Sequence, residues 1–508
     1  MDAAVAPRCG HYRLIIVFLL MFALFLIDSI KMNLGMAMVC MVNHTAFADH
    51  PTNLLRNNET LRCERNDDVS GAIEAGYTGH LLWSPSMQSL LLSAVFYGAL
   101  ITTLPSGYLA DWFSSKTLLF SSLLLYTVTT LLSPILAEVS YTAFLLNRAI
   151  MGLGEGSTFP TVVSIASHWF PPADRSAMVA IYTGGTQVAG MFGGITSASL
   201  CSMELLGGWP LIFYVYGALG VIWLLVWLVF GSSKPSGNRW ISDSERIYIM
   251  SALQYSKRDK AHKSVSRSAV GQLIKFQSFW GVPWLSILTS LPLWSVCFAW
   301  FANNFAVGII QSILPSYFRD VLQLDLKSNG MFTILPFVMQ LITKLSCGFI
   351  ADYIRRRGYL GHTATCKLFQ TVGCMGTVVT CTLLAMFIDC STPYTALFLL
   401  SLQGLIYPAF VSGWATSLVA ICPRYSRVVT SIGMPFALIG SASSPALFGL
   451  LSEYFPGSEY TLLLLAAAGI NAAAGLFFLI FGSAKIQPWA EPKTSISTIT
   501  PLHKNSSI

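Results

Sequence analysis

The feature that most constrains this chain is a series of long apolar runs. A membrane-spanning helix needs roughly 20 mainly apolar residues. About twelve such runs lie near residues 14–42, 86–110, 117–137, 142–169, 177–200, 209–230, 288–318, 328–351, 366–388, 393–421, 427–451 and 459–482. Because lipid offers the backbone no hydrogen-bond partners, each run is expected to be helical. The sequence therefore predicts an all-α membrane protein with twelve transmembrane helices.

The composition excludes an ordinary soluble protein. Only 10% of the 508 residues are charged and 54% are hydrophobic, whereas soluble domains are about a quarter charged. The net charge of +7 could suggest a nucleic-acid partner in a soluble chain. Here the basic residues lie in short loops between apolar runs, so the expected partner is the lipid bilayer and no nucleic acid.

The distribution of basic residues predicts the orientation. If both termini are cytosolic, the cytosolic segments contain most Lys and Arg residues, and the opposite side has only Arg56, Arg62, Arg65, Arg319 and Lys327. The positive-inside rule favours this arrangement. It leaves open whether the chain resides in the plasma membrane or in a lysosomal or vesicular membrane. The first non-cytosolic loop, about 43–85, contains N-glycosylation sequons at Asn43 and Asn58, which we predict as glycosylation sites.

A polar stretch at 231–285 divides the apolar runs six and six. We therefore expect an N-terminal half at 1–230, a cytosolic linker at 231–285, a C-terminal half at 286–484 and a cytosolic tail at 485–508.

A short motif is repeated in the two halves. Its first copy includes Gly107, Asp111 and Lys116, and its second includes Gly348, Asp352 and Arg355. Both copies end the second span of a six-span half. Two like halves joined by a tether are typical of secondary transporters, with the substrate site near the midplane between them. We interpret the repeated motif as a conformational loop.

Five charged residues lie at predicted membrane depth, namely Asp28, Lys31, Arg148, Glu155 and Lys344. Burying such a group costs at least a few kcal/mol, so it usually serves a transport pathway, an ion site or a pairing. Arg148 and Glu155 are seven residues apart, which places them on one face of a helix about 10 Å apart. The structural alternative is a static salt bridge within this group of charges. Lys344 is expected to snorkel to the cytosolic surface.

The loop motif at 107–116 resembles the signature of the major facilitator superfamily. The segment at 148–160, Arg-Ala-Ile-Met-Gly-Leu-Gly-Glu-Gly-Ser-Thr-Phe-Pro, resembles the fourth helix of its anion:cation symporter family. Further similarity extends over nearly the whole chain and includes the segments 32–34 and 96–98. The resemblance implies that Arg148 handles the anion, that Glu155 couples a proton, and that Lys31 stands where the family often has arginine.

The same resemblance gives the remaining candidate residues. Asn304 matches an asparagine of the family, and Asn33 and Tyr97 fall within matching segments, so with Arg148 and Lys31 they are candidate substrate-binding residues. Asp28 joins Glu155 as a candidate ion-coupling residue.

Departures from the family pattern concentrate at three positions. Ala420 replaces an acidic residue in the tenth span, Leu92 replaces a histidine of the glutamate-transporting branch, and Asn303 replaces an arginine of that branch. These changes disfavour vesicular glutamate transport.

We expect a transporter of an organic anion or phosphate, coupled to H⁺ or Na⁺, without cofactor or metal. The alternatives are a receptor or scaffold on a transporter fold and a membrane enzyme, which no convergent catalytic cluster supports. The 11 cysteines show no metal-ligand spacing, and most are expected to pack as small apolar residues.

Overall fold

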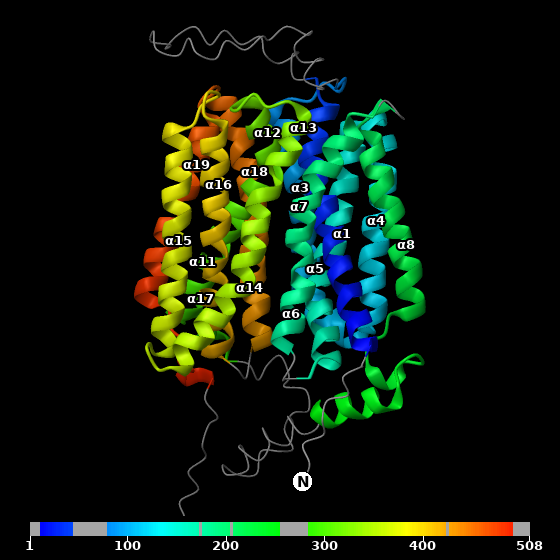
Figure 1. The fold of residues 1–508 in the computed structure, drawn as a ribbon, viewed down its shortest axis with the longest axis vertical. Helices are drawn as coiled ribbons and strands as arrows, with labels where there is room; N and C mark the ends of the chain where they lie inside the picture. The colour runs from blue at the N-terminus through cyan, green and yellow to red at the C-terminus, as the bar shows by residue number, and fades with distance from the viewer. Residues whose placement is uncertain are drawn as a thin grey trace, which may run out of the picture.

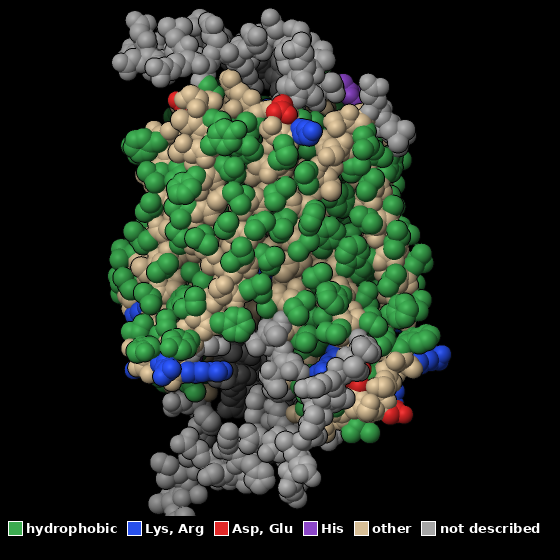
Figure 2. Space-filling view, in the orientation of Figure 1, with side chains coloured by type: hydrophobic (Ala, Val, Ile, Leu, Met, Phe, Trp, Pro, Cys, Tyr) green, Lys and Arg blue, Asp and Glu red, His purple; other side chains and the backbone are tan. Residues whose placement is uncertain are grey.

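The computed structural model describes residues 11–43, 79–171, 175–203, 207–253, 283–422 and 426–490. These residues form an upright bundle of long helices, and the predicted all-α membrane fold is confirmed (Figure 1). Hydrophobic side chains cover the visible side of the bundle, while charged side chains lie near its two ends (Figure 2). This distribution suits a protein whose flanks face lipid.

Six passes form the N-terminal half. Their helices are α1 (His11–Met41), α3 (Pro85–Trp112), α4 (Ser115–Val139), α5 (Tyr141–Trp169), the pair α6 (Arg175–Thr183) and α7 (Gly185–Cys201), and α8 (Pro210–Phe230).

Six further passes form the C-terminal half. After the short α10 (Trp284–Leu288) they are α11 (Leu291–Gly308) with the π-helix η5 (Ile309–Ile313) and α12 (Leu314–Asp320), α13 (Leu326–Phe332) with α14 (Ile334–Arg356), α15 (His362–Phe387), α16 (Pro393–Ile406) with the 3₁₀ turn η6 (Tyr407–Phe410) and α17 (Val411–Ile421), α18 (Ser426–Tyr454), and α19 (Glu459–Phe481).

Ten helices in the described part of the chain are long and apolar enough to span a membrane. The other two passes are α5 and the α6–α7 pair. Two charged residues and several glycines lower the hydropathy of α5. The fifth pass is divided at Gly184 into helices of 9 and 17 residues.

Glycines let α3 and α5 approach closely. A Cβ atom at Gly98 would collide with the carbonyl oxygen of Ala149, and one at Gly152 would collide with that of Val95. Small residues commonly permit such contacts between membrane helices. The slim face of α5 beside Gly152 is therefore occupied by a neighbouring helix.

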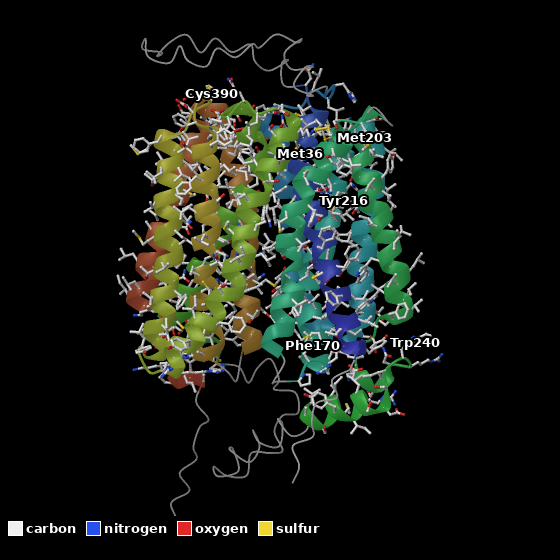
Figure 3. All side chains as sticks on the ribbon, viewed as in Figure 1. Met36, Phe170, Met203, Tyr216, Trp240 and Cys390 are labelled. Atoms are coloured by element: carbon white, nitrogen blue, oxygen red, sulfur yellow. A yellow bond between two sulfur atoms is a disulfide. The ribbon has the colours of Figure 1, made fainter. Side chains whose placement is uncertain are left out.

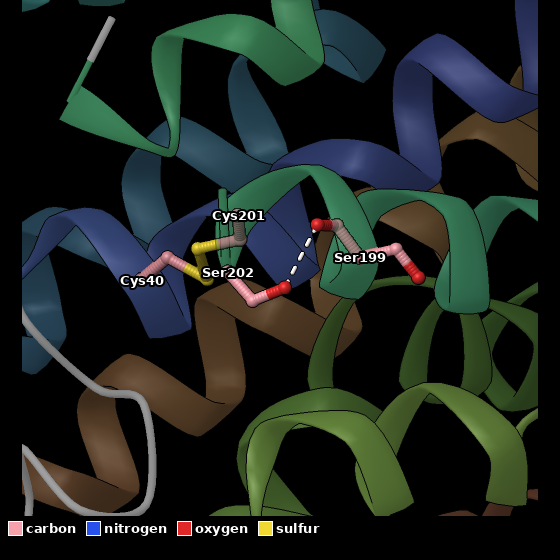
Figure 4. The surroundings of a disulfide bond; sticks show 4 residues. All are labelled: Cys40, Ser199, Cys201 and Ser202. Atoms are coloured by element: carbon pink, nitrogen blue, oxygen red, sulfur yellow. Dashed lines mark hydrogen bonds between the residues drawn. A yellow bond between two sulfur atoms is a disulfide. The ribbon is translucent and has the colours of Figure 1, made fainter. Parts of the chain in front are cut away.

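A disulfide joins Cys40 at the end of α1 to Cys201 at the end of α7 (Figure 4). Cys390 is also disulfide-bonded. Both Cys390 and Met203, two residues after Cys201, lie at the end of the bundle away from the start of α1 (Figure 3). The sequence did not predict these bonds. The expectation of buried apolar packing holds for the six free cysteines among the described residues.

The repeated loop motif falls at the ends of α3 and α14. Asp111 lies in the last turn of α3 and Asp352 in the last turns of α14, with Gly107 and Gly348 just before them. Both helices end at the end of the bundle where α1 begins (Figure 1).

The basic residues of the motif bind backbone carbonyls. Lys116 Nζ donates to the carbonyl of Leu228 at 2.9 Å, and Arg355 Nε donates to that of Ala351 at 3.3 Å. Of the two predicted glycosylation sites, Asn43 comes after Val42, the first residue beyond α1, and its backbone N–H donates to the carbonyl of Leu81 at 2.9 Å. Asn58 lies outside the described residues.

Candidate anion site between the two halves

Lys31 is the centre of a buried ionic network. Its Nζ lies 2.7 Å from Asp28 Oδ1, one turn earlier on α1, and 2.9 Å from Glu155 Oε1 on α5. The other carboxylate oxygen of Glu155 accepts a hydrogen bond from the hydroxyl of Tyr126 on α4 at 2.5 Å. The network therefore ties together three helices of the N-terminal half.

Arg148 lies outside this network. Its side chain is 1% exposed, its Nη1 meets Met151 Sδ at 3.3 Å, and its Nε has no hydrogen-bond partner among the described residues. Within that part of the chain no carboxylate forms a salt bridge with Arg148. A salt bridge within this group of charges is present, as the structural alternative expected, but it joins Lys31 to Asp28 and Glu155 and leaves out Arg148. A buried guanidinium without a counter-ion is costly, so Arg148 remains a candidate for binding an anion from outside the chain.

A small cavity connects Arg148 and Lys31. It is lined by Lys31, Leu92, Val95, Phe96, Arg148, Gln311 and Ser312. These residues come from α1, α3 and α5 on one side and from η5 on the other, so the cavity lies between the two halves. Its volume of about 10 Å³ is enough for about one water molecule. The structure is therefore closed around the two cations.

A close approach of α1 and η5 borders this cavity. A Cβ atom at Gly35 would lie only 2.8 Å from the carbonyl oxygen of Ser312, the residue that lines the cavity from η5. In this closed form the cavity has no room for an anion larger than water.

Three other candidate residues do not line this cavity. Asn33 is buried in the N-terminal half, where its Oδ1 accepts a hydrogen bond from Ser197 at 2.8 Å. Tyr97 is 43% exposed, although its neighbour Phe96 lines the cavity. Asn304 donates to the carbonyl of Trp300, one turn earlier on its own helix. The structure brings together Lys31, Asp28, Glu155 and, through the cavity, Arg148.

Lys344 does not reach the membrane surface, so that expectation was wrong. Its Nζ crosses between the halves and donates to the carbonyl of Thr183 at 2.9 Å and to Gln187 Oε1 at 3.0 Å. Thr183 is the last residue of α6, where the fifth pass is broken. Lys344, on α14 of the C-terminal half, therefore donates hydrogen bonds at the break in the fifth pass of the N-terminal half.

Tyr126 was not predicted as a partner of the charged residues, because it lies in an apolar run that resembles any other span. Ser312 was likewise missed. The π-helical turn of η5 places Gln311 and Ser312 on the cavity that Arg148 also lines. The sequence does not predict this turn.

Comparisons with known proteins agree with this architecture. Residues 17–368 match the model of the Major Facilitator Superfamily. An uncharacterized transporter of Caenorhabditis elegans, slc-17.3, is 31% identical over 94% of this chain and 89% of its own length. Human sialin is 29% identical over 96% of this chain and 92% of its own length.

Among solved structures, the inward-facing, unoccupied form of a bacterial homolog of the human lysosomal transporter Spinster has a TM-score of 0.65 at 15% identity, covering 94% of this chain and all of that one. The Escherichia coli xylose transporter XylE in a partially occluded, inward-open form has a TM-score of 0.64 at 12% identity, covering 92% and 99%. These likenesses show the fold.

The twelve-pass bundle with a site between its halves is that of a secondary transporter, and the chain belongs to the major facilitator superfamily. Within that superfamily it is a member of the anion:cation symporter family. The family is one of transporters.

Proposed function

We propose that this protein is a symporter that carries an organic anion or inorganic phosphate together with a proton. The observation that carries the proposal is the fully buried Arg148, which lacks a counter-ion among the described residues and lines a cavity shared with Lys31. A guanidinium offers two parallel donors to a carboxylate or phosphate. Relatives of this chain include sialin, putative inorganic phosphate cotransporters and a probable urate exporter, whose names support an anionic substrate.

Lys31 links the substrate to the coupling ion. It lines the cavity and also forms a salt bridge with Glu155. An anion bound to Arg148 attracts the Lys31 ammonium and weakens its contact with Glu155. A buried carboxylate that loses its counter-ion favours the neutral form, so Glu155 takes up a proton as the anion binds. Asp28 remains 2.7 Å from Lys31 and keeps it in the site.

Both termini are proposed to be cytosolic. Besides the distribution of basic residues, the Cys40–Cys201 disulfide supports this orientation, because it lies at the end of the bundle away from the start of α1. Disulfides persist in oxidising compartments, so that end would face the lumen or the exterior.

Uptake into proteoliposomes tests the function. The parent should accumulate a labelled anion from a panel of sialic acid, urate, glutamate, aspartate and phosphate when a pH gradient is imposed. Glu155→Gln should lose gradient-driven uptake and retain anion exchange. The matched control is Glu138→Gln, which changes an exposed carboxylate at the end of α4. Gradient-driven uptake by Glu155→Gln at the parent rate would contradict the proton role, and stimulation by a Na⁺ gradient alone would assign the coupling to Na⁺.

The replacement of the family's helix 10 acid by Ala420 favours the second candidate, a receptor or scaffold that no longer transports. That candidate requires binding of an anion without uptake or exchange. The same proteoliposomes distinguish it, because a receptor would bind the labelled anion at Arg148 and fail to move it.

A further inference from the structure

Lys344 brings a positive charge from the C-terminal half to the N-terminal half. Its helix, α14, and the helix α6 lie on either side of the boundary between the halves (Figure 1). The two acceptors of its Nζ, the carbonyl of Thr183 and the amide oxygen of Gln187, are both neutral. No carboxylate forms a salt bridge with Lys344 within the described part of the chain. Its charge is therefore left to act on ionised groups further away.

The nearest of these groups in the N-terminal half is on α1, which packs against the same break in the fifth pass. A Cβ atom at Gly185 would collide with the carbonyl oxygen of Met21 on α1. Asp28 follows Met21 by seven residues, and so lies on the same face of α1 two turns further along. Across this packing, the carboxylate of Asp28 and the ammonium of Lys344 interact electrostatically.

Asp28 and Glu155 therefore differ in the cations around them. Both contact Lys31 Nζ, at 2.7 and 2.9 Å. Asp28 also faces Lys344, whereas the second partner of Glu155 is the neutral hydroxyl of Tyr126. Within its own half, Asp28 faces Tyr126 on α4 and, across Lys31, Glu155 on α5. A carboxylate near two cations retains its charge more readily than a carboxylate near one.

We propose that Lys344 is a positioning residue that keeps Asp28 ionised from the opposite half, so that Glu155 alone takes up the coupling proton. This inference rests on the proposed symport. When an anion at Arg148 attracts Lys31, both carboxylates lose part of their shared counter-charge. Asp28 retains the field of Lys344. Glu155 takes a proton from water and returns it to water when the anion leaves, so one proton is carried with each anion.

The charge of Lys344 thus sets the number of protons that accompany the anion. Without it, Asp28 and Glu155 would share Lys31 alone, and both would favour the neutral form once the anion is bound. The number of protons taken up on binding equals the slope of the logarithm of the affinity against pH. This slope should therefore increase when the charge of Lys344 is removed.

Substitutions that separate charge from hydrogen bonding test this role. Lys344→Gln keeps a side-chain donor and removes the charge, whereas Lys344→Arg keeps the charge. Adding Asp28→Asn to Lys344→Gln removes the second carboxylate. Lys116→Gln is the matched control, because Lys116 Nζ also donates to a backbone carbonyl, that of Leu228 at 2.9 Å.

Binding of each labelled anion of the uptake panel is measured with the full-length protein in nanodiscs from about pH 5 to 8. Thermal melting checks the folding of every variant. Titration of the anion itself affects all proteins equally, so the slopes of the variants are compared with that of the parent.

The affinity of the parent should fall about tenfold per pH unit while Glu155 is ionised in the free protein, and Lys344→Arg and Lys116→Gln should match it. In Lys344→Gln the fall should approach about a hundredfold per unit. The added Asp28→Asn should restore the parent slope, which a merely structural role of Lys344 does not explain. A parent slope in folded Lys344→Gln would overturn the inference.

Asp28→Asn alone gives a second decision if Lys344→Gln does not fold. This variant should keep the parent slope, because Asp28 is not the group that takes up the proton. Affinity that no longer depends on pH in Asp28→Asn would make Asp28 the proton carrier and would overturn the inference. Affinity independent of pH in the parent would instead overturn the proton role in the proposed function, and a parent that binds no anion would overturn that function itself.

Discussion

Replacing Arg148 with methionine separates a binding role from a structural one. Methionine keeps a long, flexible side chain in the same space and removes the charge. Arg148 is 1% exposed and makes no salt bridge within the described residues, so the change breaks no ion pair there. It also removes an arginine from the centre of a membrane helix, where the charge costs about 2.5–3.5 kcal/mol.

The expected result is a folded variant of equal or higher stability that no longer binds the anion. Local relaxation in the parent relieves part of this cost. We therefore expect the free energy of unfolding of the variant to rise by about 2 kcal/mol, equivalent to a rise of a few degrees in the melting temperature. In the parent, an anion at about 100 times its Kd should add roughly 2.7 kcal/mol of stability. That ligand-dependent shift should disappear in Arg148→Met.

Lys31→Met provides the contrast. It removes the cation that lies 2.7 Å from Asp28 and 2.9 Å from Glu155, and so leaves two carboxylates without their partner. Breaking a buried pair in this way costs about 3–5 kcal/mol, so the melting temperature should fall. Both variants are measured in detergent by thermal melting with and without the anion. If Arg148→Met melts as low as Lys31→Met, Arg148 has a structural partner and our reasoning is wrong.

Three further predictions concern packing and modification. Lys344→Met should lower the melting temperature, since the hydrogen bonds from a charged donor to Thr183 and Gln187 contribute about 1.5–3 kcal/mol each. Lys344→Arg keeps a charged donor and should retain most of this stability. Equal melting temperatures of the two variants would show that the contact between the halves adds no stability. Gly152→Leu should abolish monodisperse protein in size-exclusion chromatography because it collides with α3, whereas Gly469→Leu, with no atom within 4 Å, should elute normally. The pair Asn43→Gln and Asn58→Gln should eliminate any glycosidase-sensitive gel shift, and a shift that survives would place the sugar elsewhere.

The helices were predictable because each span is encoded locally. The predicted runs at 86–110 and 459–482 correspond to α3 (Pro85–Trp112) and α19 (Glu459–Phe481) within a few residues, since lipid selects long apolar segments whatever their neighbours are. The spacing also allowed a pair between Asp28 and Lys31, one turn apart on the same helix, and this pair is present.

The sequence allowed Lys31 as a partner of Glu155 but could not select it, and it did not indicate Tyr126. Lys31 and Tyr126 come from helices 124 and 29 residues away, and a pattern within α5 contains no information about which side chains of α1 and α4 face it. The Cys40–Cys201 bond, which spans 161 residues, was missed for the same reason. Lys344 was misplaced because snorkelling was assumed from its position in the span, whereas its actual acceptors belong to the opposite half.

We propose different roles for Lys31 and Arg148 because these two cations have different partners. Lys31 is neutralised by two carboxylates, so an anion that reaches it must compete with Asp28 and Glu155. Arg148 has no such competitor among the described residues, and in the proposed function it supplies the free energy that draws the anion into the cavity. Because Lys31 lines the same cavity, we expect an anion at Arg148 to weaken the Lys31–Glu155 contact through charge alone, without a direct contact to Glu155. The proposal thus couples substrate binding to protonation through one shared lysine.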